Sequence, residues 1–411
     1  MSCGLWVQKF GGTSVATPEL MRNAARRIAE RRDAGYRTMV VVSAMGDTTD
    51  RLVDLARSLS HDPPRRELDV LLSAGEVQSM ALLVIALEES GIPAISFTGR
   101  QGGIRTDDRY CDARIKEIEG KRIRTELDQG RVVVVAGFQG VSAEDDITTL
   151  GRGGSDTSAV ALAAALGASR CEILTDVEGV FTADPGVVPG ARRIERLSYD
   201  EMLEMATYGA RVLHGRAVDL ARRYRVPLTV ASATVPGPGT EIEPGIAGGE
   251  EPQEMESVVV RGVTQDPDVR KVVIVRVPDQ PGVAARVFGV LGREGVGVRL
   301  IVQAQSHEGH NDITFIVPAS THIPEPLLEE TVAAVKGGSF LVEDDVGLLS
   351  VIGEGIARDP GVAGRVFQIL AEQGINIDLI STSNLVITCV VPEKSLERGA
   401  RALHEGLIEE G

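Results

Sequence analysis

The sequence is poor in aromatic residues and lacks a long uninterrupted apolar run. Aromatic side chains make up 3% of its 411 residues, so stacking platforms for single-stranded nucleic acid are scarce. The longest apolar stretches, Val132–Phe138 and Ala159–Ala168, fall short of the roughly 18 residues that a membrane-spanning helix needs. We therefore expect no nucleic-acid partner and no membrane association.

Cysteine is also rare, and the four cysteines lie far apart, at Cys3, Cys111, Cys171 and Cys389. They form no CxxC pair and match no histidine at a metal-site spacing, which predicts reduced, buried thiols. Residues 1–4 lead directly into a strand pattern, without the charged and apolar regions of a signal peptide. Together these features predict a cytoplasmic protein.

Positive charge is in deficit, and the formal net charge is −16. Residues 1–250 hold 30 basic and 35 acidic side chains, whereas residues 251–411 hold 13 and 24, so the second part would repel a polyanion. Of the 43 basic residues only six are lysines, three of them before residue 250. A lysine in a ligand-binding loop of this chain therefore suggests a specific chemical need.

Short β-rich runs alternate with helical patterns over the first 235 residues or so. The expected strands are Leu5–Gln8, Thr38–Val42, Ala94–Phe97, Arg131–Ala136, Cys171–Thr175 and Pro227–Ala231. The expected helices are Pro18–Ala34, Glu67–Ser90, Asp112–Gln129, Asp156–Leu166 and Tyr199–Tyr224. This alternation predicts an α/β domain with a mostly parallel sheet between helices, and ligand-binding loops after the strands.

A duplication marks the rest of the chain. Val235–Gln253 is crowded with proline and glycine, which indicates a domain boundary. Beyond it, residues 279–301 and 358–380 share 11 identities in 23 positions, at an offset of 79. We therefore divide the chain into a first domain (1–235), a linker (236–256) and two α+β modules (257–340 and 341–411).

Two glycine-rich loops are suited to anions. The first runs from Lys9 to Ser14 after a strand, where glycines allow close approach and the lysine adds charge for a phosphate, although such turns are often purely structural. The second, Leu150–Thr157, combines three glycines and Arg152 with a helix N-terminus. Asp156 in this loop has three open roles: a helix cap, a partner for Lys9, or a metal ligand.

Further loops are weak indicators when each is taken alone. They are Val42–Thr49, Ser73–Glu76 and Thr175–Pro185, whose polar residues often serve only as caps or turns. His214, on a helical pattern among charged residues, favours a structural role. Taken together, the loops favour phosphoryl transfer and leave the substrate open.

In this order the loops resemble those of the aspartate kinases. The matching stretches are Lys9–Val15, Ser43 with its neighbours, Ala74–Glu76, Thr149–Thr157 and Thr175–Pro185. The duplicated modules resemble the tandem, ferredoxin-like ACT domains that follow the catalytic domain there. The resemblance implies an amino-acid-kinase fold that transfers the γ-phosphoryl group of ATP to the β-carboxylate of L-aspartate. The product, 4-phospho-L-aspartate, begins lysine, threonine and methionine biosynthesis.

The resemblance also implies roles for individual residues. Lys9 and Asp156 are the expected catalytic residues, and Mg²⁺ is expected on the nucleotide phosphates rather than at a metal site of the protein. The expected substrate-binding residues are Ser43, Thr49, Glu76, Arg152 and Ser155, with Arg152 on the α-carboxylate and Glu76 on the α-ammonium group. The expected nucleotide-binding residues are Lys9, Phe10, Gly11, Gly12, Thr175, Asp176, Phe181, Arg211 and Val212.

Three positions depart from the family pattern around the nucleotide. Gly186 stands where an arginine is common, Arg211 replaces a lysine with Gly215 in place of a proline four residues later, and Phe181 replaces a tyrosine. None of these changes removes Lys9, and we still expect an active enzyme. The alternatives that stay open are a kinase of the same fold for another amino acid and a non-catalytic amino-acid sensor.

For the ACT modules, the resemblance implies regulation by lysine and threonine. The expected effector-binding residues are Asp279, Gly282, Gln303, Val362, Ala363, Asn376 and Ile377. Arg299 stands in the first module where the second has Asp378, and this charge reversal predicts weakened feedback. We also expect a homo-oligomer formed through the ACT modules. An α₂β₂ assembly with an in-frame short subunit starting at Met255 stays open.

Overall fold

The computed structural model describes residues 3–244, 259–305, 309–356 and 359–409, and the chain divides into two compact units. Unit 1 comprises Met1–Phe181 and Arg193–Glu251, and unit 2 comprises Thr182–Arg192 and Pro252–Gly411. Unit 2 therefore takes up a short segment from within the first part of the chain. Met255 lies outside the described residues.

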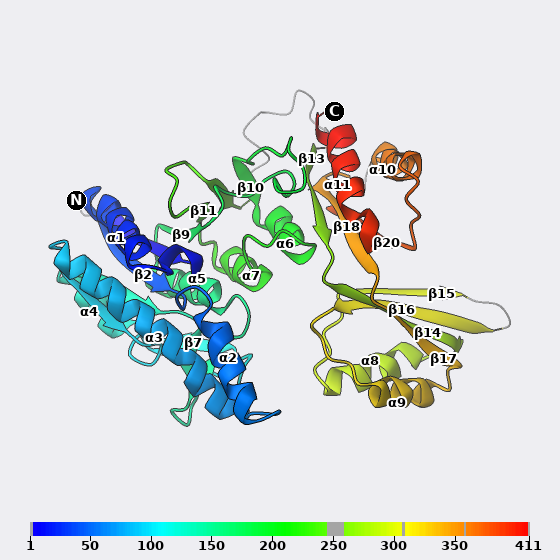
Figure 1. Ribbon diagram of the computed structural model, residues 1–411, viewed down its shortest axis with the longest axis horizontal. Helices are drawn as coiled ribbons and strands as arrows, with labels where there is room; N and C mark the ends of the chain where they lie inside the picture. The colour runs from blue at the N-terminus through cyan, green and yellow to red at the C-terminus, as the bar shows by residue number, and fades with distance from the viewer. Residues whose placement is uncertain (1–2, 245–258, 306–308, 357–358, 410–411) are drawn as a thin grey trace. The chain divides into compact units, whose positions relative to one another are not determined.

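A mostly parallel sheet forms the centre of unit 1, with the strand order β10-β12-β11-β9-β1-β2-β6-β3 (Figure 1). Only β12 is antiparallel to a neighbour among the described pairings of this sheet. The bounds are β1 Cys3–Phe10, β2 Tyr36–Val42, β3 Ala94–Phe97, β6 Val132–Ala136, β9 Arg170–Thr175, β10 Arg196–Ser198, β11 Leu228–Ser232 and β12 Thr240–Glu243. The predicted α/β class is confirmed.

Helices cover the sheet and bury its apolar residues. The helices of unit 1 are α1 Pro18–Asp33, α2 Thr48–Leu59, α3 Arg65–Glu89, α4 Lys121–Asp128, α5 Gly154–Leu166, α6 Tyr199–Thr207 and α7 Gly215–Tyr224. Side chains of α1 and α3, such as Ile28 and Leu83, share one core with alternate residues of β2 and β6. The helices α4 and α5 contact the sheet without contributing to that core. Because both faces are covered, β6 is buried along its whole length.

A smaller sheet with the order β5-β4-β7-β8 also belongs to unit 1. Its strands are β4 Ile104–Thr106, β5 Ile115–Ile118, β7 Gln139–Val141 and β8 Ile147–Thr149. The expected helix Asp112–Gln129 is wrong in its first half, which forms β5, and α4 begins only after Gly120 at φ 57°. The expected helix Tyr199–Tyr224 is two helices, α6 and α7, and α2 was not predicted.

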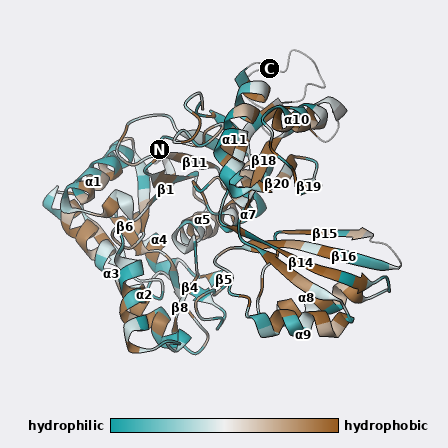
Figure 2. Cartoon of the chain, turned by 45° about the vertical axis from the view of Figure 1, so that its right-hand side comes forward, coloured by the Kyte–Doolittle hydropathy of each residue, from teal (hydrophilic) through white to brown (hydrophobic). Residues whose placement is uncertain are grey.

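The described residues of unit 2 form two antiparallel sheets flanked by helices. One has the order β15-β16-β14-β17 and the other the order β13-β18-β20-β19. The strands are β13 Val259–Asp266, β14 Val269–Pro278, β15 Leu300–Gln305, β16 His310–Pro318, β17 Ser339–Glu343, β18 Val346–Glu354, β19 Leu379–Thr382 and β20 Val386–Pro392. The helices are α8 Val283–Arg293, α9 Glu325–Val335, α10 Pro360–Glu372 and α11 Leu396–His404. Figure 2 shows the apolar colours concentrated on strands such as β14 and β16.

The strand pairings divide the chain differently from the expected boundaries in three places. β12 pairs with β11 inside the stretch expected to be a linker. β13 lies inside the stretch expected to be the first module but pairs with β18 of the second. β17 crosses the expected boundary between residues 340 and 341 and pairs with β14.

The segment Thr182–Arg192 completes the second module. Ala183 and Val188 are buried in the same core as Leu370 and Leu403. The Thr182 carbonyl accepts a hydrogen bond from the Val263 amide at 2.8 Å. The segment is therefore a structural part of unit 2.

The helix α3 is long and apolar enough, by length and composition alone, to cross a membrane. The absence of a long uninterrupted apolar run in the sequence did not indicate such a helix, because polar residues interrupt the apolar residues of α3. Its buried side chains, including Met80, Leu83 and Leu87, pack in the core of unit 1. This is the pattern of a core helix in a globular domain.

Candidate active site

A cavity of about 300 Å³ lies in unit 1, where β1 and β2 end and α5 begins. Its walls come from the strand-end loops and from α3, and they consist of Lys9, Gly12, Ser43, Ala44, Gly46, Thr49, Glu76, Phe138, Gly151, Arg152, Gly153, Gly154, Ser155 and Asp156. Ligands of parallel α/β sheets bind at this edge. The expected catalytic and substrate-binding residues all line this one cavity.

The loops after β1 and β2 are tied together at the floor of the cavity. The Ser43 amide donates to the Phe10 carbonyl at 3.1 Å, and the Gly46 amide donates to the Gly12 carbonyl at 3.0 Å. A Cβ atom on Gly12 would lie 2.7 Å from the Ala44 carbonyl oxygen, so a larger residue would push the loops apart. Glycine is needed here for close approach of two backbones.

Lys9 and Asp156 form an ion pair across the cavity wall, with 2.7 Å between Nζ and Oδ1. Each side chain is only 12% exposed, so the pair is screened little by solvent. The N-cap of α5 is Gly153 and not Asp156. Of the three roles left open for Asp156, the geometry favours the contact with Lys9. Among the described residues, no group of three His, Cys, Asp or Glu side chains is arranged to hold a metal ion.

Glu76 projects into the cavity from the middle of α3 and is 3% exposed. Its Oε1 accepts a hydrogen bond from the Ala44 amide at 3.1 Å, whereas Oε2 has no hydrogen-bond partner among the described residues. Burial raises the pKa of the Glu76 carboxyl from 4.5 to about 7. A buried carboxylate with an unused oxygen is suited to an ammonium group.

Arg152 lies between Gly151 and Gly153, both of which have positive φ angles. Its side chain is exposed, and among the described residues it has no hydrogen-bond or ion-pair partner. The guanidinium group can therefore offer both of its N–H edges to a carboxylate. Ser43, Thr49 and Ser155 add hydroxyl groups to the same cavity.

The expected nucleotide-binding residues are only partly at this cavity. Lys9 and Gly12 line it, but the Phe10 side chain is fully buried in the core and points elsewhere, because alternate residues of β1 face opposite sides of the sheet. Gly11 is bound to the next strand, its amide donating to the Leu174 carbonyl at 3.1 Å. The other five, Thr175, Asp176, Phe181, Arg211 and Val212, are not among the residues that line the cavity.

The remaining five residues lie at the end of β9, in the stretch after it and in the turn after α6. The Thr175 hydroxyl donates to the Asp176 carboxylate at 3.0 Å, at the end of β9. Phe181 pairs with Arg193 as an isolated β-bridge. Arg211 and Val212 lie in the turn after α6. Gly186, the departure noted in the sequence, lies within the segment that belongs to unit 2.

Phe138 and His214 are two residues near the cavity. The sequence indicated no functional role for Phe138 and favoured a structural role for His214. Phe138 follows β6 and lines the cavity, so the rule that ligand loops follow strands could have identified it. His214 caps α7, with Nδ1 accepting from the Arg216 amide at 3.3 Å, and burial lowers its pKa. This cap agrees with the structural role that the sequence favours.

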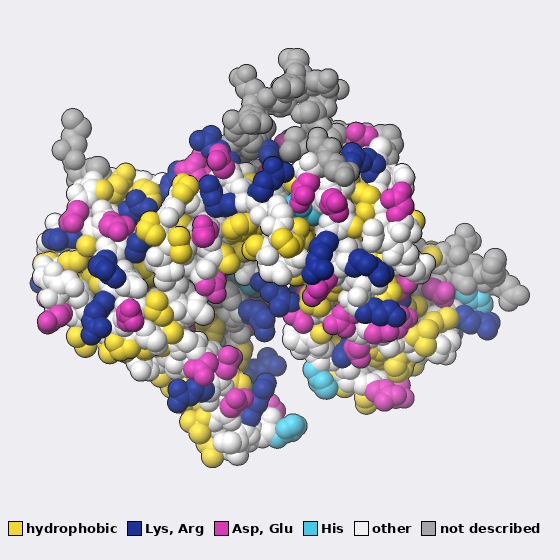
Figure 3. Space-filling view, turned by 45° about the horizontal axis from the view of Figure 1, so that its top comes forward, with side chains coloured by type: hydrophobic (Ala, Val, Ile, Leu, Met, Phe, Trp, Pro, Cys, Tyr) yellow, Lys and Arg dark blue, Asp and Glu magenta, His cyan; other side chains and the backbone are white. Residues whose placement is uncertain are grey.

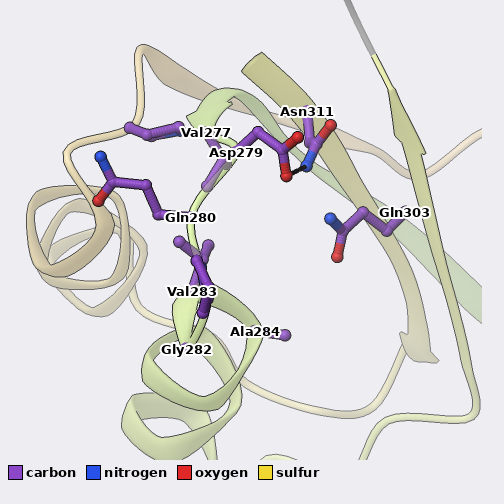
Figure 4. A pocket seen from close by; sticks show the side chains of 10 residues that line it. Val277, Asp279, Gln280, Gly282, Val283, Ala284, Gln303 and Asn311 are labelled. Atoms are coloured by element: carbon purple, nitrogen blue, oxygen red, sulfur yellow. Dashed lines mark hydrogen bonds between the residues drawn. The ribbon is translucent and has the colours of Figure 1, made fainter. Parts of the chain in front are cut away.

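A second cavity, of about 340 Å³, lies in unit 2 at the turn between β14 and α8. The Asn311 amide donates to the Asp279 carboxylate at 2.9 Å, and Gln303 on a neighbouring strand faces the same space (Figure 4). Asp279, Gly282 and Gln303 were expected here, and Asn311 was missed. Asn376 is bonded to Asp378 at 3.3 Å. Three of the expected effector residues, Val362, Ala363 and Ile377, pack against the core of the second module.

Comparisons with known proteins agree with this architecture. The amino acid kinase family matches residues 4–232, and ACT domains match residues 271–337 and 349–407. An aspartokinase from Mycolicibacterium smegmatis is 47% identical over 408 residues, which cover 98% of this chain and 95% of that protein.

Two solved structures of E. coli aspartokinase III are each 28% identical to this chain and cover 98% of it and 99% of their own length. The R-state complex with aspartate and ADP has a TM-score of 0.85, and the T-state complex with lysine and aspartate has a TM-score of 0.73. With more than half of the chain matched by the family and almost all of it by curated relatives, the chain belongs to the aspartokinases of the amino acid kinase family.

Proposed function

We propose that the chain transfers the γ-phosphoryl group of ATP to the β-carboxylate of L-aspartate in the cavity of unit 1. The observation that carries this proposal is the placement of Arg152 and Glu76, which suit an α-carboxylate and an α-ammonium group, beside the Lys9–Asp156 pair. The aspartate and ADP named for the E. coli aspartokinase III structure give the matching substrate and product.

In the transfer, a β-carboxylate oxygen of aspartate attacks the γ-phosphorus atom and the bond to the bridging oxygen of ADP breaks. Because the carboxylate is already ionised, the step needs positioning and charge neutralisation rather than a general base. Lys9 neutralises charge on the transferred group, and Asp156 holds the Lys9 ammonium group in place, at 2.7 Å. Ser43, Thr49 and Ser155 orient the substrate by hydrogen bonds.

The nucleotide contacts Lys9, Gly11 and Gly12, together with Thr175, Asp176, Phe181, Arg211 and Val212. These residues lie at the ends of the strands β1 and β9 or in the stretches that follow β1, β9 and α6, and this position supports their assignment. Phe10 contributes its backbone only. Mg²⁺ retains water readily and binds substrate phosphates, so it enters on the nucleotide.

The test is ATP-dependent formation of aspartyl hydroxamate by the full chain and by Lys9→Ala. We expect the Lys9→Ala variant to lose activity about 100- to 1,000-fold, as when one stabilising donor is removed from a transition state. Lys116→Ala is the matched control, because Lys116 is an exposed lysine of the same unit. Unchanged activity in Lys9→Ala contradicts the assignment. Absence of activity with aspartate, followed by activity with another amino acid, identifies a related kinase, and no activity with any identifies a sensor.

The cavity of unit 2 supports an amino-acid effector site formed by Asp279, Gly282 and Gln303, with Asn311 added. Asp279 can hold an ammonium group and the amides a carboxylate. Arg299 does not line this cavity and pairs with Asp266 instead, so the charge reversal gives no structural ground for weakened feedback. Lysine plus threonine, added to the hydroxamate assay, measures the strength of feedback directly.

The assembly and location are part of the same proposal. Exposed apolar side chains on edge strands of unit 2, such as Ile301 and Leu341, support a homo-oligomer formed through the ACT modules. Light scattering, which measures the mass of the assembly, tests this proposal. A short polypeptide that is still seen on a gel after substitution of Met255 argues for proteolysis rather than internal initiation. Acidic and basic side chains are interspersed on the face seen in Figure 3, as suits a cytoplasmic enzyme.

A further inference from the structure

The position of Arg152 is fixed by its backbone alone. Its guanidinium group has no partner among the described residues, and its side chain is exposed. Thr149 and Leu150, three and two residues before it, are by contrast fully enclosed, with exposed fractions of 1% and 0%. Whatever holds these two residues therefore decides where Arg152 meets its ligand.

Asp69, on α3, is the carboxylate that holds Thr149. It is 0% exposed and accepts hydrogen bonds from the Thr149 amide at 2.9 Å and the Thr149 hydroxyl at 2.6 Å. It also accepts from the Cys111 amide, at 3.1 and 3.0 Å to its two oxygens. A buried carboxylate needs such donors, and each one is stronger than a neutral hydrogen bond.

The segment around Cys111 holds the Arg152 loop from its other side. Together with Asp69 it forms the frame of the loop. The Ala113 amide donates to the Thr149 carbonyl at 2.9 Å. The Arg216 guanidinium group donates to the carbonyl oxygens of Leu150 and Ala113, each at 2.6 Å. A Cβ atom on Gly151, where φ is +74°, would lie 2.9 Å from the Cys111 carbonyl oxygen. The loop base thus rests directly on this segment.

One helix connects this frame to the other end of the substrate. Asp69 and Glu76 are seven residues apart on α3, which places them on the same face about 10.5 Å apart along the axis. Glu76 faces the cavity directly, while Asp69 acts on the loop that carries Arg152. The helix therefore sets the spacing between the proposed ammonium and carboxylate contacts.

We propose that Asp69 is a positioning residue that enforces selection for an α-carboxylate by anchoring the Arg152 loop. The inference rests on the proposed function, in which Arg152 binds the α-carboxylate of aspartate. Removal of the Asp69 charge should leave the cavity and Lys9 intact but let the loop shift. The defect should therefore fall on aspartate affinity and on discrimination between aspartate and its α-amide, and not on ATP.

The experiment compares Asp69→Asn, Arg152→Gln and their double variant in the hydroxamate assay, using L-aspartate and L-aspartate α-amide. We expect Asp69→Asn to raise KM for aspartate about tenfold to hundredfold, with KM for ATP within about twofold of the parent value. The preference for aspartate over its α-amide should fall in both single variants. The double variant should lose little more than Arg152→Gln alone, because both changes act on one contact.

The matched control is Glu67→Gln, an exposed acid on the same helix, which should leave every parameter unchanged. If Asp69→Asn does not fold, Thr149→Val removes one donor and should shift KM for aspartate in the same direction by a few-fold. A normal KM for aspartate in Arg152→Gln contradicts the proposed function. The positioning role is overturned by a different pattern, in which Arg152→Gln is defective with aspartate but Asp69→Asn keeps the parent's preference for aspartate over its α-amide. Asp69→Asn would then lose kcat equally with both substrates.

Discussion

The two cavities differ in how their charged groups are held. In unit 1, Lys9 is paired with Asp156, Glu76 is a buried side chain in the cavity wall, and the loop of Arg152 is hydrogen-bonded to a buried carboxylate. In unit 2, the Asp279 side chain has one hydrogen-bonded side-chain partner among the described residues, Asn311, at the turn between β14 and α8. A cavity for group transfer needs charges fixed before the substrate arrives, whereas a cavity that senses a ligand can be ordered by it.

The largest expected effect is that of Asp156→Asn, which removes the carboxylate paired with Lys9. We expect kcat to fall about 100-fold or more, because the ammonium group is no longer held where charge develops. Steady-state kinetics of hydroxamate formation measure the loss. Calorimetric binding of threonine or lysine to unit 2 should be unchanged in this variant, and a loss of effector binding would break the contrast between the cavities.

The next effect concerns Glu76 and pH. Because burial raises the pKa of Glu76 to about 7, its ammonium-binding form is lost as the pH falls through 7, and KM for aspartate should rise. Glu76→Gln should raise KM about tenfold at pH 8 and remove most of this dependence. A KM profile of Glu76→Gln that still rises below pH 7 would assign the titration to another group.

The same carboxyl makes a second prediction about stability. Between pH 4.5 and about 7 the folded chain retains a proton that the unfolded chain releases, so the contribution of Glu76 to stability falls as the pH rises. Glu76→Gln should therefore gain stability relative to the parent at pH 8 and not at pH 4. Thermal unfolding at the two pH values tests this, and an equal difference at both would contradict it.

A smaller effect is expected for Asp279→Asn in unit 2. The variant should need about tenfold more effector for half-inhibition, because one charged contact is lost. Its kcat and KM without effector should equal those of the parent. Asp344→Asn, an exposed acid of the same unit, is the control. Inhibition curves that coincide for Asp279→Asn and the parent would move the effector site elsewhere.

The smallest effect is expected for Arg299→Ala. Its partner Asp266 keeps a hydrogen bond from the Asp268 amide, at 3.0 Å, so the melting temperature should fall by only a few degrees. Half-inhibition by the effectors should change less than about twofold, because Arg299 does not line the cavity. A large change would restore the role that the sequence suggested for this charge.

The sequence predicted those helices and strands whose own residues show a clear helical or strand-like apolar periodicity. The helices α1 and α3 and the strands β2 and β3 lie within a few residues of their expected bounds. The small sheet and β5 were missed, because β5 is held by pairing with β4 and nothing in its own four residues marks it as a strand. The pairing of β13 with β18 was missed for the same reason, because the partner of a strand depends on contacts between residues far apart in the sequence.

The residues predicted for catalysis and substrate binding line one cavity of unit 1, because most of them lie at the ends of strands or in the stretches that follow them, which are recognisable in the sequence. Lys9, Arg152 and Asp156 stand among glycines, which make them visible. Asp69 has no such context: it is one acid on a helix, and only its burial and its hydrogen bonds to Thr149 point to the role proposed for it. The Phe10 side chain was misplaced because strand alternation turns it into the core while Lys9 faces the cavity.

The path of residues 182–192 makes unit 2, which holds the ACT domains, discontinuous in the gene. A fragment that starts at Met255 lacks Ala183 and Val188, which are 5% and 4% exposed in the core of the second module. It also lacks Thr182, whose hydroxyl lies 2.8 Å from Nε2 of the fully buried His404. In such a short subunit, the core side chains that Ala183 and Val188 cover would be exposed to solvent. The subunit could be stable only if another polypeptide, or a rearranged C-terminal helix, covered them.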